Sequence, residues 1–210
     1  MDTYVKYPRT FHLPWSLGIT NDDKVLKSTD CFRGMDVVVT EKMDGENTTL
    51  YRNHTHARSL DSRHHPSRDW IKGFWGNIRY QIPHGLRICG ENLYATHSIK
   101  YDNLYSYFYG FSIWNNENVC LSWEDTIEYF IGLDIVSVPV LYKGIYDEKI
   151  IKELWNDSMQ DASEGYVVRN IEAFKYDDFG KNVAKFVRPA HVTSDEHWMH
   201  QQMTVNVLKK

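Results

Sequence analysis

A strand–turn–strand pattern near the amino terminus constrains the fold of this chain more than any other feature. Residues 37–42 (Val-Val-Val-Thr-Glu-Lys) and 47–52 (Asn-Thr-Thr-Leu-Tyr-Arg) are rich in β-branched side chains, which favour strands. Between them lies Asp44-Gly45, a dipeptide that is common in the tight turns of hairpins. The pattern therefore predicts two strands joined by a hairpin turn at Asp44-Gly45, with Lys42 at the end of the first strand.

Lys42 has the most informative chemistry in this pattern. Three carboxylates stand next to it in the sequence, those of Glu41, Asp44 and Glu46. An ordinary lysine has a pKa of about 10.4 and is protonated at neutral pH, whereas nucleophilic attack on phosphorus requires the free amine. Neighbouring negative charge raises the pKa of a lysine further, so burial and bound positive charge would have to outweigh it. Lys42 is therefore a candidate covalent nucleophile in a site that also needs a divalent metal ion.

The remaining strands and helices alternate irregularly along the chain. Further strands are predicted from β-branched and aromatic content at residues 56–60, 86–91, 107–114, 138–142, 166–169 and 183–187. Helices are predicted from capping residues and apolar spacing at residues 67–80, 122–133, 148–156 and 190–210. This irregular order predicts an α+β fold with largely antiparallel sheets rather than a doubly wound parallel sheet.

Length and composition favour a single cytoplasmic domain. The 210 residues, 42% of them hydrophobic, suffice for one buried core, so residues 1–210 are expected to form one domain with no separate domain after it. The three cysteines are odd in number and lack C-x-x-C spacing, which argues against a disulfide framework and fits a reducing compartment. No signal-peptide pattern and no apolar run of about 18 residues supports export or membrane insertion.

The charge pattern argues against a protein that is uniformly coated by nucleic acid. The formal net charge is -4 at pH 7. One stretch is nevertheless locally basic, and it contains Arg52, His54, His56, Arg58, Arg63, His64, His65 and Arg68. Such a stretch suits the binding of a phosphate-bearing end.

Four further motifs follow the Lys42 pattern. They are Cys-Gly-Glu-Asn-Leu-Tyr at 89–94, Tyr-Phe-Tyr-Gly-Phe-Ser-Ile-Trp at 107–114, Ser-Glu-Gly-Tyr-Val-Val-Arg at 163–169 and Val-Ala-Lys-Phe-Val-Arg at 183–188. Together with Lys-Met-Asp-Gly at 42–45, this series resembles the covalent nucleotidyltransferases, which include RNA ligases, DNA ligases and capping guanylyltransferases. Residues 41–47 resemble most closely the ATP-dependent RNA ligases of the phage RNA ligase 2 type. The resemblance covers about residues 37–188 and implies a nucleotidyltransferase (ATP-grasp-like) domain of antiparallel β-sheets flanked by helices.

The resemblance implies catalytic roles for Lys42, Lys185 and Glu164. Lys42 would attack the α-phosphorus of ATP to give lysyl-AMP, and Lys185 would neutralise the α-phosphate as pyrophosphate leaves. Glu164 would hold the divalent ion, and Glu91 would bind the ribose hydroxyls or join Glu164 at the metal. The implied cofactors are ATP and Mg2+ or Mn2+, which is consistent with the preference of Mg2+ for few carboxylates, waters and substrate phosphates.

Four more residues would bind the nucleotide or the substrate. Glu41 would meet the adenine amino edge, and Asn47 would lie near the phosphates and the metal; the lesser alternative is that either residue merely ends a strand. Phe111 would stack on the nucleobase. Arg58 would bind a phosphate or the 5′-phosphorylated end, for which its planar guanidinium is suited.

Two arginines are alternative phosphate ligands. Arg63 lies in the loop 61–68, which could fold over the site or into solvent. Arg188 is a possible substitute for the second lysine that the family often has where this chain has Val187, but strand alternation would turn Arg188 to the opposite face. Ser112 also departs from the family, which usually has an aspartate after the stacking ring.

The leading hypothesis is an ATP-dependent RNA ligase that joins 3′-hydroxyl and 5′-phosphate ends through lysyl-AMP and an adenylylated 5′ end. It would act on RNA ends in repair, alongside an end-healing kinase or phosphatase. The alternatives are a DNA ligase, a capping guanylyltransferase and a non-catalytic nucleotide-binding or RNA-end-binding domain. The motifs fit RNA, DNA or hybrid ends, nicked or single-stranded, with either metal.

Overall fold

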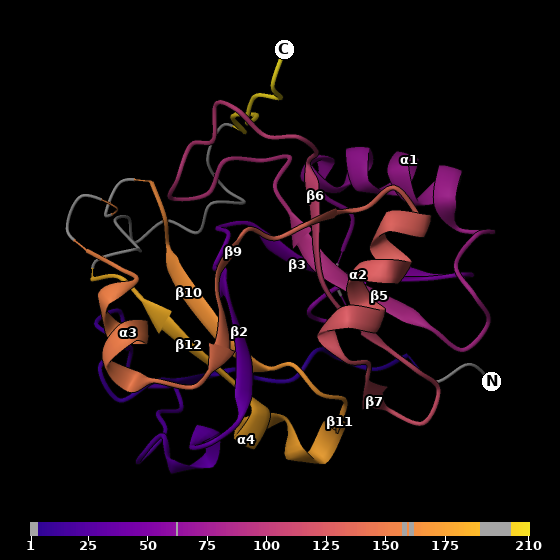
Figure 1. Ribbon diagram of the computed structural model, residues 1–210. Helices are drawn as coiled ribbons and strands as arrows, with labels where there is room; N and C mark the ends of the chain where they lie inside the picture. Colours follow the sequence, from indigo (N-terminus) through magenta and orange to yellow (C-terminus); the bar gives the residue numbers. More distant parts are fainter. Residues whose placement is uncertain (1–3, 62, 157–158, 160–161, 190–202) are drawn as a thin grey trace.

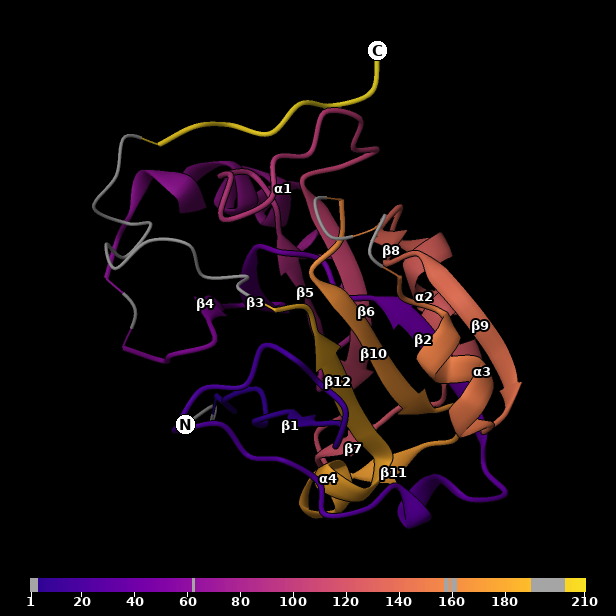
Figure 2. The same cartoon turned by 90° about the vertical axis from the view of Figure 1, so that its left-hand side faces the viewer.

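Two mostly antiparallel sheets form the two main layers of the fold (Figures 1 and 2). The computed structural model describes residues 4–61, 63–156, 159, 162–189 and 203–210. Among these residues, the first sheet consists, in spatial order, of β1 (Phe11–His12), β12 (Val183–Val187), β10 (Gly165–Asn170), β2 (Asp36–Glu41) and β9 (Val140–Ile145).

The second sheet holds the other described strands. Its order is β11 (Phe174–Lys175), β7 (Val119–Cys120), β6 (Phe108–Trp114), β5 (Arg87–Asn92), β3 (Glu46–Tyr51) and β4 (Thr55–Ala57), with β8 (Val136–Ser137) beside β6. Only the pairs β1–β12 and β6–β8 are parallel among the described strand pairs. The predicted α+β class with largely antiparallel sheets is confirmed.

Helices flank the sheets. They are α1 (Asp69–Ile78), α2 (Trp123–Gly132), α3 (Glu148–Glu153) and α4 (Phe179–Asn182), with 3-10 turns at Asp30–Phe32, Pro66–Arg68 and Tyr176–Asp178. The predicted cap of α2 is confirmed, because the Ser122 hydroxyl accepts a hydrogen bond from the Asp125 N–H. In the described part of the chain, none of the helices has the length and apolar character needed to cross a membrane.

The predicted hairpin between residues 37–42 and 47–52 is wrong. Both strands form, as β2 and β3, but β2 pairs with β9 and β10 in the first sheet, whereas β3 pairs with β4 and β5 in the second. The segment between them is a crossover from one sheet to the other. The chain after Lys42 therefore connects the two layers of the fold.

Tertiary contacts explain why Asp44-Gly45 makes a crossover instead of a hairpin turn. The Asp44 carboxylate accepts hydrogen bonds from the N–H groups of Ser98 and Ile99 at 2.7 and 2.8 Å, far from its own turn in the sequence. Gly45 lies against the end of β5, where an added Cβ would be 2.5 Å from the Asn92 carbonyl oxygen. Glycine is required at position 45 by this close approach.

The predicted helix over 190–210 is also corrected, as far as its residues are described. Residues 203–210 are extended, and Val205 and Leu208 form isolated bridges with Ala95 and Leu104. The buried Asn206 holds this segment down, because its side chain donates to the Leu93 carbonyl. Residues 190–202 of the predicted helix lie outside the described residues.

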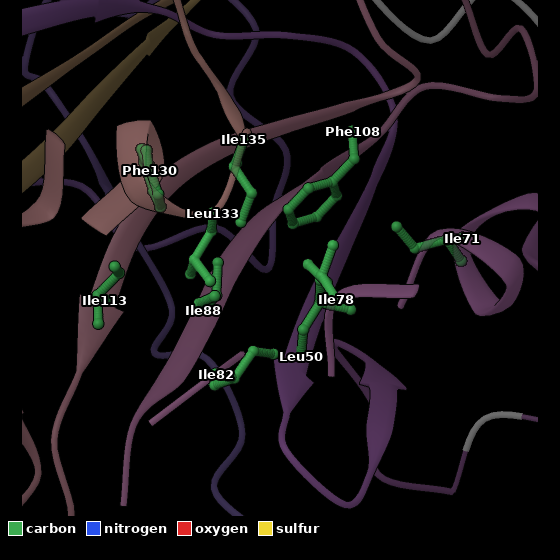
Figure 3. Packing of buried hydrophobic residues seen from close by; sticks show 10 residues of the cluster. All are labelled: Leu50, Ile71, Ile78, Ile82, Ile88, Phe108, Ile113, Phe130, Leu133 and Ile135. Carbon is green, nitrogen blue, oxygen red and sulfur yellow. The ribbon is translucent and has the colours of Figure 1, made fainter. Parts of the chain in front are cut away.

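One hydrophobic cluster attaches α1 and α2 to the second sheet (Figure 3). Its residues come from β3, β5 and β6 on the sheet side and from α1, α2 and the adjoining loops on the other: Leu50, Ile71, Ile78, Ile82, Ile88, Phe108, Ile113, Phe130, Leu133 and Ile135. Burial of one such side chain contributes about 1.5–3 kcal/mol. The cluster therefore fixes the outer face of this sheet, while its inner face is turned toward the first sheet.

Candidate active site

Strand alternation turns the chemically active side chains toward the space between the two sheets. Val38 of β2 packs with Tyr109 of the second sheet, and Cys89 of β5 packs with Val183 of the first, so these side chains occupy that space. Side chains recur on one face every two residues, which turns the Glu91 side chain the same way as that of Cys89. A cavity of about 410 Å³ opens there, and the predicted residues that line it are Glu41, Lys42, Asn47, Arg58, Glu91, Phe111, Glu164 and Lys185.

Lys42 and Glu164 form an ion pair inside the cavity. The backbone N–H of Lys42 donates to the Gly165 carbonyl, which holds the end of β2 against β10. Lys42 Nζ then lies 2.5 Å from Glu164 Oε2, and the two side chains are 23% and 5% exposed. The nearest acceptor for a proton from the Lys42 ammonium is therefore a buried carboxylate.

Carboxylates decide the charge of Lys42, but the main ones are Glu164 and Glu91 rather than its sequence neighbours Glu41 and Glu46. Burial alone lowers the pKa of Lys42, but the negative charges of Glu164, Glu91 and Asp44 outweigh it and raise this pKa above its ordinary value. The ammonium is thus the resting form. Added positive charge in the cavity would be needed to favour the free amine.

Glu91 is the second carboxylate that faces Lys42. Burial raises the pKa of Glu91 to about 8, the charges of Glu164 and Asp44 add to this rise, and the Lys42 ammonium opposes it. The Glu91 carboxyl therefore loses its proton less readily than an ordinary glutamate, and positive charge in the cavity would favour its ionised form.

The donor set fits a divalent ion that retains waters and substrate phosphates. The oxygen atoms of Glu91 and Glu164 are the hard ligands that Mg2+ and Mn2+ accept. The Asn47 Oδ1 atom, which lines the same cavity, is buried without a hydrogen-bond partner in the described part of the chain. Within that part, no three His, Cys, Asp or Glu side chains are grouped to hold a metal. The protein would supply few ligands, as is usual for Mg2+ at phosphates.

Lys185 lines the cavity from β12 in the first sheet. Burial lowers the pKa of Lys185, the Lys42 ammonium lowers it further, and Asp23 and Glu164 act in the opposite direction. The Lys185 Nζ atom lies 3.9 Å from Asp23 Oδ1. The predicted pair of lysines therefore meets in one cavity, which Asp23 also lines.

The amino-terminal segment contributes several cavity residues that the motifs do not predict, among them His12 and Asp23. His12 on β1 is 1% exposed; its Nε2 lies 3.3 Å from Asp23 Oδ2 and its Nδ1 lies 2.8 Å from Ser16 Oγ. Burial lowers the pKa of His12. The available signal was the apolar run Phe11-His-Leu-Pro-Trp15, in which a histidine is flanked by residues that favour the core.

The Phe111 ring forms part of the wall opposite the lysines. Phe111 is half-buried and meets the Tyr7 ring edge-to-face, with the centroids 5.2 Å apart. Arg169 also lines the cavity and donates to the carbonyls of Phe111 and Leu121. Ser112, where the family usually has aspartate, also lines the cavity, and its hydroxyl accepts a hydrogen bond from Trp114 Nε1 at 3.1 Å.

The structure does not bring Arg63 and Arg188 into the cavity with the other predicted residues. Arg63 lines a separate depression with residues of β4 and α1, and its carbonyl accepts a hydrogen bond from Arg68. Arg188 is 7% exposed and its backbone N–H donates to the Glu164 carbonyl. Arg58, just after β4, is the basic residue of the 52–68 stretch that lines the cavity.

Solved structures of nucleotidyl-transferring ligases share this fold. An archaeal ATP-dependent RNA ligase is 18% identical with a TM-score of 0.55 over 87% of this chain and 48% of its own. A putative ATP-dependent DNA ligase from Aquifex aeolicus is 20% identical with a TM-score of 0.56 over 87% and 50%. A mutant of Naegleria gruberi RNA ligase, solved with ATP and Mn, is 16% identical with a TM-score of 0.50 over 87% and 58%.

A match to a family model identifies the family of this chain, and the solved ligases are longer than the chain. This chain spans about half of the length of the solved ligases, from 48% to 58%. No curated protein matches it significantly. A family model for RNA ligases matches residues 35–187, which run from just before β2 to the end of β12 and contain Lys42, Glu91, Glu164 and Lys185. Because this match covers most of the chain and its motif residues line one cavity, the chain belongs to the RNA ligase family.

Proposed function

We propose that the protein is an ATP-dependent RNA ligase that carries AMP on Lys42 and joins 3′-hydroxyl and 5′-phosphate ends. The observation that carries this proposal is the arrangement of Lys42, Glu164 and Lys185 in one half-enclosed cavity of an RNA ligase family member. A nucleotide-binding domain without catalysis would have no need of an amine held 2.5 Å from a buried carboxylate.

In the first step, the Lys42 amine attacks the α-phosphorus of ATP. The N–P bond forms as the bond from the α-phosphorus to the bridging oxygen breaks, and pyrophosphate leaves with the electron pair. Glu164 Oε2, at 2.5 Å, is the group within reach of the proton that Lys42 must lose. Lys185 and Arg58 line the same cavity and would neutralise the charge on the phosphates.

A divalent cation, Mg2+ or Mn2+, adds positive charge at the phosphates when bound, and Glu91 and Glu164 are the side chains that would hold it. The ATP and Mn in the structure of the Naegleria RNA ligase mutant support this choice for the present chain. Phe111 would stack on the adenine, Glu41 would accept from its amino group, and Asn47 would lie beside the phosphates.

Two further displacements would complete ligation. The AMP on Lys42 passes to a 5′-phosphate, which breaks the N–P bond and gives an adenylylated 5′ end. A 3′-hydroxyl then attacks that 5′-phosphorus, a phosphodiester forms, and AMP leaves. For these steps the protein supplies mainly in-line positioning and charge neutralisation.

We also propose that residues 1–210 act as one adenylyltransferase domain in the cytoplasm. The thiols of Cys31, Cys89 and Cys120 are free, which supports a reducing compartment. An end-healing kinase and phosphatase are the class of partner that would supply 5′-phosphate and 3′-hydroxyl ends for repair.

Labelled nucleotide tests the first step. The protein is incubated with α-labelled ATP and Mg2+ or Mn2+, denatured, and examined for covalent label. We expect label from ATP in the wild type, none in Lys42→Ala, and wild-type labelling in Lys181→Ala, a lysine on the surface whose partner is Asp178. Label from GTP alone would favour a capping guanylyltransferase. Absence of label with both nucleotides and both metals would contradict an enzyme of this class.

A further inference from the structure

A second surface has the composition of a nucleic-acid binding site. It is a groove of about 660 Å³ at the ends of β3 and β5 that lie away from Asn47 and Glu91. We call it the arginine groove, after Arg52, Arg79 and Arg87 in its wall. The chain carries a net charge of -4, yet no aspartate or glutamate is among the described residues that line this groove.

Two of the arginines are held in place by contacts that leave most of their donors unused. Arg52 donates from one terminal nitrogen to the carbonyls of Tyr80 and Ile82. Arg79 donates from Nε to the Arg52 carbonyl, and its guanidinium lies over the Trp75 ring, 4.4 Å from the centroid. A guanidinium has five N–H donors, so each arginine is oriented in advance for an anion.

Tyr80 gives the groove an aromatic surface. Its side chain is 69% exposed, even though the Arg79 guanidinium lies 4.9 Å from its ring centroid. An exposed ring near the guanidiniums of Arg52 and Arg79 suits an unpaired base, because a base in a duplex is already stacked between its neighbours. The groove therefore fits a single strand better than a double helix.

The groove and the cavity adjoin along two segments of the chain. In the amino-terminal segment, Tyr4 and Val5 line the groove and Tyr7 lines the cavity. Only Lys6 lies between Val5 and Tyr7, so the chain between the two sites is at most about 7 Å long there. The segment around β4 runs the same way, from Arg52 in the groove to Arg58 in the cavity. A strand whose end occupies the cavity could thus continue into the groove.

We propose that the arginine groove binds single-stranded RNA adjacent to the end that enters the cavity. Arg79, with Arg52 and the exposed His84 beside it, holds the phosphates, and the Tyr80 ring stacks on a base. The choice of RNA as the strand rests on the proposed ligase function. The proposal that the groove binds a phosphate next to an unpaired base is independent of the ligase function.

Binding of labelled RNA tests the groove with two variants that have different signatures. Fluorescence anisotropy would report the affinity for a 5′-phosphorylated strand of about twelve nucleotides, long enough for a single-strand site. We expect Tyr80→Ala to weaken binding about five- to tenfold without changing its salt dependence. Arg79→Gln should weaken binding and also reduce the slope of log affinity against log salt by about 0.7, because one phosphate contact is lost.

Matched controls come from the same chain. Tyr105→Ala removes a tyrosine that is 68% exposed and has the Lys209 ammonium 4.7 Å from its ring centroid, but lies outside the groove. Arg33→Gln removes the same charge from a side chain that is 83% exposed and paired with Asp30. Both controls should bind the long strand as the wild type does. A 5′-phosphorylated dinucleotide whose end is held in the cavity would cover the groove only in part, so the groove variants should weaken its binding less than that of the long strand.

Lysyl-AMP formation from ATP alone keeps the two proposals separate. If the groove variants bind the long strand as the wild type does while adenylylation is intact, the groove proposal is overturned and the ligase proposal stands. An acidic polypeptide would then be the better candidate for the groove. If adenylylation is absent but Tyr80→Ala and Arg79→Gln lose RNA affinity as expected, the groove proposal stands without the ligase. Equal losses on the dinucleotide and the long strand would also contradict the groove.

Discussion

Lys42 and Glu164 form a close ion pair within the cavity, and the Glu164 carboxylate raises the pKa of Lys42. They are 2.5 Å apart and 23% and 5% exposed, so water screens the pair only partly. Lys42→Ala keeps the buried Glu164 carboxylate but removes the ammonium that faces it. We expect this variant to lose about 1–3 kcal/mol of unfolding free energy, less than a fully buried pair would lose, because Lys42 retains some contact with solvent.

Adding Glu164→Gln to Lys42→Ala should recover most of that loss, because the amide removes the buried negative charge and keeps the shape. Urea unfolding of the wild type, the two single variants and the double variant measures this coupling. If the loss of unfolding free energy in the double variant equalled the sum of the losses in the two single variants, the two side chains would be energetically independent. Glu164 could not then be the group that raises the pKa of Lys42.

The cavity residues differ in whether neighbouring sequence is enough to predict their place in the site. Lys42, Glu91, Glu164 and Lys185 stand in motifs whose order can be read along the chain, and the structure brings all four together. His12 is different, because it reaches the site only through the parallel pairing of β1 with β12, where it stands opposite Lys185. A two-residue strand with a partner so distant in the sequence leaves no periodic pattern, so the apolar run 11–15 indicates that His12 is buried but not that it lies beside Lys185.

Among the secondary-structure elements, the crossover between β2 and β3 begins at Lys42 and leads from the first sheet to the second. Gly45→Ala should disturb it, because the added Cβ would lie 2.5 Å from the Asn92 carbonyl oxygen and the strand ends would have to separate. We expect a loss of about 1–3 kcal/mol in unfolding free energy, together with slower lysyl-AMP formation. Chemical unfolding and the labelling assay measure the two effects.

Gly73→Ala in α1 is the matched control, because an added Cβ there meets nothing within 4 Å. Alanine in a helix interior is favoured over glycine by about 0.5–1 kcal/mol, so this variant should be more stable than the wild type and label normally. Destabilisation of both variants to a similar degree would show that the crossover does not depend on the close approach at position 45.

The same crossover shows which part of an element the sequence determines. The strands 36–41 and 46–51 follow from β-branched content, and the cap of α2 follows from Ser122 and Asp125. The partners of these strands could not be predicted in the same way. The Asp-Gly turn signal is local, whereas the Asp44 carboxylate accepts hydrogen bonds from the distant N–H groups of Ser98 and Ile99. Those contacts lie more than fifty residues along the chain and decide the partner of β3.

In the molecule as a whole, the cavity lies between the two sheets and is lined by both. Lys42 and Lys185 reach it from the first sheet, and Glu91 and Phe111 reach it from the second. A nucleotide bound there would contact both layers and raise the free energy of unfolding of the molecule as one unit. At a concentration of about 100 times its Kd, one ligand adds about 2.7 kcal/mol.

For a chain of this size, that stabilisation corresponds to a rise in Tm of roughly 5–10 °C, which thermal unfolding would measure with an ATP analogue that cannot be cleaved between the α- and β-phosphates. Mg2+ alone should raise Tm much less, because among the described residues no three His, Cys, Asp or Glu side chains are grouped to hold an ion. Lys185→Ala should reduce the shift caused by the analogue, since it removes one of the charges at the phosphates. An equal rise in Tm in the wild type and in Lys185→Ala would mean that the analogue binds elsewhere, and the nucleotide could not then be the ligand that bridges the two sheets.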